Sequence, residues 1–136
     1  MSFESRTSPA TVLAEALDAE DYDSARAILA DDCRYEIRGE VIEGADAIIA
    51  TYRDNGGKGR KSFDRVVYES SVSALSETRE RIDYTDRITN EGEQLVHRCA
   101  QEVEVDPDTG LIGQIVHVDL PGEKEALDAF KKRHGW

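Results

Sequence analysis

The sequence predicts an α+β protein in which a curved, mostly antiparallel sheet wraps around N-terminal helices to form a cone. Three observations lead to this prediction. Residues 8–55 show mostly helical apolar spacing, residues 65–120 alternate with period two in four segments, and the chain then returns to helical spacing. A length of 136 residues predicts one domain, residues 1–136, large enough to bury a core.

The first two helices are predicted from their start signals. Ser8 is a suitable N-cap and Pro9 suits the first helical position. The apolar stripe of this helix is Val12, Leu13, Ala16 and Leu17. Asp21 is the expected N-cap of a second helix over residues 22–30, which would bury Ala25, Ile28 and Leu29. We expect Asp31 and Asp32 to end this helix.

A short strand, a turn and a third helix follow. Residues 33–37 alternate as a strand, and Gly39 and Gly44 flank the turn. The third helix is predicted over residues 45–54, because Asn55-Gly56 is a helix-ending signal. A basic cluster, Gly-Gly-Lys-Gly-Arg-Lys at residues 56–61, is interpreted as a mobile linker. A phosphate seat is the alternative, although the strand–loop–helix setting of a nucleotide loop is missing.

Four strands are predicted over residues 65–75, 79–88, 94–105 and 111–120, and Pro121-Gly122 opens the last helix. The turn at residues 90–93 sets Thr89 opposite Gln94. Counting back along both strands gives the pairs Asp86–His97, Tyr84–Cys99 and Ile82–Gln101. All of them lie on the more apolar face, which the fold makes the pocket face.

The face of the last strand stays open between two registers. If Val105 faces Leu111, His117 faces Cys99, and Asp119 faces His97 inside the pocket. If Asp106 faces Leu111, the inward residues are instead Ile112, Gln114, Val116 and Val118, because a shift by one residue exchanges the two faces of a strand. Apolar content favours the second register.

Composition excludes several classes of function. A net charge of −12 argues against nucleic-acid binding, and no apolar run is long enough to cross a membrane. The N-terminus shows no signal peptide, so we expect a cytoplasmic protein with Cys33 and Cys99 as reduced thiols. No hydrolase, zinc or dinucleotide motif is present, and the three histidines show no metal-ligand spacing. We therefore expect neither a cofactor nor a metal.

Two segments carry a resemblance to a known family. Residues 19–32, ending in Leu-Ala-Asp-Asp, lead into a strand, and Gly44, Ile48 and Tyr52 then follow at four-residue intervals. This pattern resembles the nuclear transport factor 2-like superfamily, on the side of the SnoaL-like polyketide cyclases and ketosteroid isomerases. The resemblance implies a cone-shaped pocket between helices and sheet, and a homodimer formed through the sheet.

The isomerases' catalytic residues do not carry over to this sequence. Aligned on residues 30–32, the position of their catalytic aspartate falls on Ile37, and that of their oxyanion-binding tyrosine falls on Leu13. A base and an oxyanion donor are both required for that chemistry. The resemblance therefore does not imply ketosteroid isomerase activity here.

The Asp86–His97 pair is the candidate catalytic centre. A carboxylate beside a histidine fixes its tautomer and stabilises the imidazolium, which makes the ring a base. Tyr84 or Tyr35 is the expected proton donor to a substrate carbonyl. The expected pocket residues are Tyr35, Ile37, Tyr52, Tyr68, Cys99, Gln101, His117 and Asp119. The alternative is a partly exposed pair that only stabilises the hairpin, with the tyrosines as core aromatics.

Three functional hypotheses follow from these residues. The first is a cofactor-free isomerase, cyclase or lyase acting on a small, mostly apolar, carbonyl-bearing molecule. The second is a non-catalytic module that binds a ligand or a partner chain, expected if tyrosines fill the pocket. The third is a dimer that keeps only a residual pocket.

Overall fold

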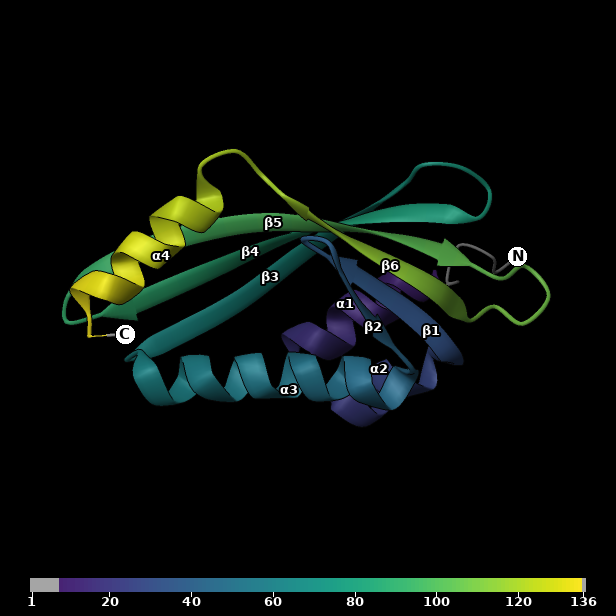
Figure 1. Cartoon of the computed structure of the whole chain (residues 1–136), viewed down its shortest axis with the longest axis horizontal. Coiled ribbons are helices and arrows are strands. Elements are labelled where there is room, and N and C mark those ends of the chain that lie inside the picture. Colours follow the sequence, from purple (N-terminus) through teal and green to yellow (C-terminus); the bar gives the residue numbers. More distant parts are fainter. Residues whose placement is uncertain (1–7, 136) are drawn as a thin grey trace, which may run out of the picture.

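The computed structural model describes residues 8–135, apart from the side chain of Arg60 (Figure 1). The N-terminal segment in which we found no signal peptide lies outside the described residues. One six-stranded sheet has the order β2-β1-β6-β5-β4-β3, in which only β1 and β6 are parallel. The α+β prediction with a curved, mostly antiparallel sheet is confirmed.

The elements follow in the order α1 (Pro9–Asp18), α2 (Tyr22–Ala27), β1 (Leu29–Ile37), β2 (Glu40–Glu43), α3 (Ala45–Ser62), β3 (Arg65–Ala74), β4 (Arg79–Asn90), β5 (Glu93–Val105), β6 (Ile112–Asp119) and α4 (Glu123–Arg133). Both predicted N-caps are present, since the Ser8 and Asp21 side chains accept from the backbone N–H groups of Thr11 and Ser24. No helix in this part of the chain is long and apolar enough to cross a membrane.

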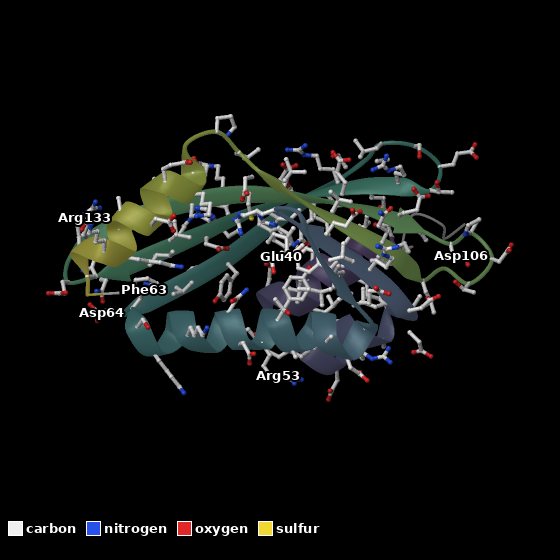
Figure 2. All side chains as sticks on the ribbon, viewed as in Figure 1. Glu40, Arg53, Phe63, Asp64, Asp106 and Arg133 are labelled. Atoms are coloured by element: carbon white, nitrogen blue, oxygen red, sulfur yellow. The ribbon has the colours of Figure 1, made fainter. Side chains whose placement is uncertain are left out.

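The main core lies between the sheet and the first three helices. Leu13 of α1 and Ile48 of α3 pack with Ile82, Val103 and Ile115 of the sheet, and all five are fully buried. A smaller cluster joins the end of α3 to α4 through Phe63 and Phe130, whose ring centroids are 5.6 Å apart. Figure 2 shows Phe63 and Arg133 at this end of the molecule, and Asp106 at the opposite end.

Three local predictions were wrong. The second helix ends at Ala27, and Asp31 and Asp32 lie within β1, because Leu29 pairs with Ile112 and draws the chain into the sheet. The segment between Gly39 and Gly44 forms strand β2, which was predicted only as a turn. The supposed linker at residues 56–61 is helical, because α3 continues to Ser62.

The register between β4 and β5 is the predicted one, with Asp86 opposite His97 and Tyr84 opposite Cys99. Neither predicted register between β5 and β6 holds along the whole pair. Val105 pairs with Ile112, as in the second, but the next pair is Glu104 with Gln114, so Gly113 has no partner in the ladder. This β-bulge exchanges the faces of β6, so His117 lies on the face that the first register predicted, but the pairs of that register were wrong: His117 and Asp119 lie opposite Gln101 and Cys99 and not opposite Cys99 and His97.

Candidate functional site

A pocket of about 500 Å³ lies between the inner face of the sheet and helices α1, α3 and α4. Ten sequence-predicted site residues line it: Tyr35, Ile37, Tyr52, Tyr68, Tyr84, Asp86, His97, Cys99, Gln101 and His117. The eleventh, Asp119, does not line the pocket, but it contacts two residues that do, His117 and Arg38. The tyrosines therefore do not fill the space between the helices and the sheet.

Gln101 connects three tyrosines on one wall of the pocket. Its side-chain oxygen accepts hydrogen bonds from the hydroxyls of Tyr52, at 2.8 Å, and Tyr84, at 3.2 Å. Its side-chain nitrogen donates to the Tyr35 hydroxyl at 3.1 Å. These bonds satisfy an amide that is only 3% exposed. Because Tyr35 accepts in this network, its own proton stays available to a ligand, whereas the protons of Tyr52 and Tyr84 are used.

Ring stacking also positions two of these tyrosines. Tyr35 and Tyr52 stack with their centroids 5.7 Å apart and their planes inclined by 16°. Burial raises the pKa of Tyr35 to about 12 and the pKa values of Tyr52 and Tyr84 well above their usual range. All three are neutral hydroxyls at physiological pH, suited to hydrogen bonding rather than to acting as bases.

Asp86 and His97 lie opposite each other, but no hydrogen bond joins their side chains among the described residues. The Nδ1 atom of His97 is buried without a partner. Burial lowers the pKa of His97, and burial together with the nearby Asp18 raises the pKa of Asp86 to about 6. Burial thus favours the neutral form of both side chains. The pKa of Asp86 lies near physiological pH, so this carboxyl can gain and lose a proton there.

Asp18 of α1 is a second carboxyl at the same wall. Its side chain accepts a hydrogen bond of 2.5 Å from the hydroxyl of Ser70 on β3. Burial raises its pKa, and the bond from Ser70 opposes that shift. Asp18 and Asp86 both line the pocket, so that one carboxylate disfavours ionisation of the other.

A hydrogen-bonded histidine–aspartate pair does exist in the pocket wall, at His117 and Asp119. The Nε2 atom of His117 lies 3.0 Å from Oδ1 of Asp119. Arg38 in turn donates to both carboxylate oxygens of Asp119, at 2.7 Å each. The side chain of His117 is 10% exposed, and its Nδ1 is buried and has no partner among residues 8–135. Burial lowers the pKa of His117 while Asp119 opposes the shift, so the ring is largely uncharged at neutral pH.

This arrangement defines the tautomer of His117. Because Asp119 accepts from Nε2–H, the lone pair lies on Nδ1 of a ring that lines the pocket. The two bonds from Arg38 keep the Asp119 carboxylate ionised and hold its pKa below the usual range. A proton taken up by His117 would therefore be stabilised by a fixed negative charge.

Sequence reasoning missed several residues of the pocket. Asp18, Tyr22, Arg38, Lys58, Lys124 and Lys131 all line it. Asp18 follows the apolar residue Leu17 at the end of α1, so the helical spacing alone would have placed it near the sheet. Arg38 lies in the β1–β2 turn, and only the parallel pairing of β1 with β6 brings it to Asp119.

The thiols contribute no reactive group. Burial raises the pKa of Cys33 to about 11 and that of Cys99 to about 12, so both remain protonated. Both are free cysteines. Among residues 8–135 no group of three or more histidine, cysteine or acidic side chains could hold a metal ion.

Comparisons with known proteins identify the fold. No family model and no curated protein matches the sequence. Among solved structures, a proposed polyketide cyclase from Xanthomonas campestris is 20% identical, with a TM-score of 0.67 over 87% of this chain and 92% of that chain. An LEH-like epoxide hydrolase from M. tuberculosis is 22% identical, with a TM-score of 0.61 over 92% and 93%.

A third structure, an NTF2-like protein of unknown function from Exiguobacterium, is 12% identical, with a TM-score of 0.64 over 84% of this chain and 99% of that chain. At such identities the likeness concerns the fold and not the chemistry. The order of elements, the curved sheet and the pocket between sheet and helices agree with it. This chain therefore has the nuclear transport factor 2-like fold.

Proposed function

We propose that the protein binds a small, mostly apolar, carbonyl-bearing molecule in this pocket and transfers a proton on it without a cofactor. The reaction would be of the isomerase, cyclase or lyase type. The observation that carries the proposal is the His117–Asp119–Arg38 arrangement at the pocket wall. A neutral histidine with one nitrogen held by a carboxylate and the other unpartnered has the features of a general base.

The other groups of the pocket fit complementary roles. Tyr35 keeps a free proton for the carbonyl oxygen of the ligand, where negative charge develops as a carbon–hydrogen bond breaks. Asp86, with a pKa of about 6, can return a proton at a second position. Asp119 and Arg38 act through His117 and are positioning residues. His97, opposite Asp86, is the alternative base.

The test is exchange of carbon-bound hydrogen for deuterium in small ketones and enones, followed by proton NMR in D₂O. His117→Gln is expected to slow exchange by about 100-fold, the lower end of what a general base contributes. His97→Gln is the matched control and should change the rate by less than tenfold. Asp119→Asn should alter the pH profile of exchange, which a purely structural role would leave unchanged.

The reverse result, loss of exchange with His97→Gln alone, would transfer the role of base to His97 and Asp86. A non-catalytic binding module is the second candidate, favoured by the use of the Tyr52 and Tyr84 hydroxyls within the protein. Ligands that bind in the pocket yet never exchange hydrogen or change chemically would support that candidate.

A further inference from the structure

The pocket gathers positive charge in a strongly acidic protein. The chain has 29 acidic and 17 basic residues. Of the acids among the described residues, three line the pocket, namely Asp18, Asp86 and Asp128, together with Arg38 and the lysines Lys58, Lys124 and Lys131. The excess of acids over the whole chain is thus absent in this pocket.

These four cations come from three separate elements around the pocket. Lys58 belongs to α3, Lys124 and Lys131 belong to α4, and Arg38 lies in the β1–β2 turn. Three of them converge on one carboxylate. The pKa of Asp128 is lowered first by its hydrogen bond from Lys124 and then by the charges of Lys124, Lys131 and Arg38. We call these four residues the cationic rim.

Two ion pairs involve the cationic rim. Asp119 forms an ion pair with Arg38, and Asp128 accepts a hydrogen bond from Lys124 at 2.7 Å. Lys58 makes no ion pair with any residue that the structure describes. The four cations equal in number the carboxyls of Asp18, Asp86, Asp119 and Asp128, so the pocket lacks the acidic excess of the whole chain.

We propose that the ligand of this pocket is an amphiphilic anion, with its apolar body among the tyrosines and a carboxylate or phosphate at the cationic rim. This inference rests on the proposed ligand pocket and adds the charge of the ligand. A protein of net charge −12 repels anions at long range. Local cations at the pocket mouth would be needed to admit one, and they would have no such role for a neutral ligand.

The test compares two fluorescent probes with the same apolar body. One is 8-anilinonaphthalene-1-sulfonate, and the other is N-phenyl-1-naphthylamine, which lacks the sulfonate. The double variant Lys58→Gln/Lys131→Gln should weaken binding of the sulfonate about fivefold or more and leave the neutral probe unchanged. The matched control is Lys61→Gln/Lys132→Gln, which removes two charges from the same helices away from the pocket, with less than a twofold effect expected.

Displacement of the bound sulfonate then distinguishes the two anionic groups. Octanoate and octyl phosphate should both compete better than octanol, and the stronger competitor identifies the group that fits. Equal competition by octanol, or equal weakening by both double variants, would overturn the inference while leaving a pocket for neutral ligands.

A separate pair of variants tests the pocket itself. Ile37→Trp and Leu127→Trp fill it from β1 and from α4, and their folding is checked by circular dichroism. Both should abolish binding of both probes. If folded variants bind the neutral probe as well as the native protein does, the probes bind elsewhere, and the proposed function is overturned together with the inference.

Discussion

Asp86 is a partly buried carboxyl whose environment stability measurements can detect. Burial and the nearby Asp18 raise its pKa from 3.8 to about 6. A raised pKa means that the folded state binds the proton more tightly than the unfolded chain does. Asp86 therefore destabilises the folded protein progressively as the pH rises from about 4 through about 6.

Replacing Asp86 by Asn should stabilise the protein at pH 8. The amide cannot ionise, so the cost of the buried charge disappears, and a shift of this size corresponds to roughly 2–3 kcal/mol. At pH 4 the effect should fall below about 1 kcal/mol, because the acid is then protonated in the folded state and only partly ionised in the unfolded state. Denaturant unfolding at both pH values measures the difference.

Asp83→Asn is the control for this prediction. Asp83 lies on the same strand but on the opposite face, where it pairs with Arg81 at 3.1 Å. It should change stability by less than about 1 kcal/mol, in the destabilising direction at pH 8. Equal effects of Asp86→Asn at pH 4 and pH 8 would contradict the buried-charge explanation.

At the residue scale, sequence reasoning located the pocket residues better than it located their partners. The tight turn at residues 90–93 fixed the register of β4 and β5, and period-two alternation then set Asp86 opposite His97. It could not foresee that Asp119 would contact Arg38, 81 residues away in the chain. Gly113 is a signal that sequence reasoning overlooked, since a glycine inside a strand indicates a bulge, and this bulge decides that His117 faces the pocket.

At the element scale, helix α3 is the clearest departure from local propensity. Asn55-Gly56 predicts a helix end, but the helix continues through Gly56, Gly57 and Gly59. Tertiary packing supplies the reason at Gly56. A Cβ atom built there would lie 2.7 Å from the hydroxyl oxygen of Tyr22, so any larger residue would require the Tyr22 side chain to move. Propensity is a weak predictor where two helices pack at a glycine.

The neighbouring glycines of α3 should respond in opposite ways to alanine. Nothing lies within 4 Å of a Cβ atom built at Gly57, so Gly57→Ala should stabilise the protein by about 0.5–1 kcal/mol through helix propensity. Gly56→Ala should destabilise it by about 1 kcal/mol, because the new methyl group displaces Tyr22. Thermal or denaturant unfolding of both variants gives the comparison.

Tyr22→Phe provides the internal control. Removing the hydroxyl removes the closest contact at Gly56, so Gly56→Ala should become neutral or stabilising in the Tyr22→Phe background. A destabilisation that is the same in both backgrounds would show that Tyr22 is not the reason for glycine at this position.

At the scale of the whole molecule, the sequence predicted the class of the fold because its strongest signals are apolar patterns that extend over many residues. Four alternating segments, connected by turns, specify an antiparallel meander, and helices before it must cover one face. The parallel pairing of β1 with β6 is invisible locally, since it joins segments about 80 residues apart. That pairing makes β1 part of the sheet and places Arg38 at the pocket.

The outer face of the sheet is where we expect the homodimer that the family resemblance implied. On this face, strands β3 and β4 carry ion pairs such as Arg81–Asp83 and Arg87–Glu69. Strand β6 instead carries Val116 and Val118, which are apolar and half-buried. A two-fold interface brings the same patch of both subunits together. Valines near the axis would then meet their own copies.

Light scattering with size-exclusion chromatography should give twice the mass of the 15.1-kDa chain. Val118→Arg should halve that mass, because it places like charges against each other across the two-fold axis. Val41→Arg, an exposed residue on the edge strand β2, is the matched control and should leave the dimer intact. A native protein of single-chain mass at micromolar concentration would contradict the dimer, and it would leave the pocket, which one chain builds by itself, as the only place for function among the described residues.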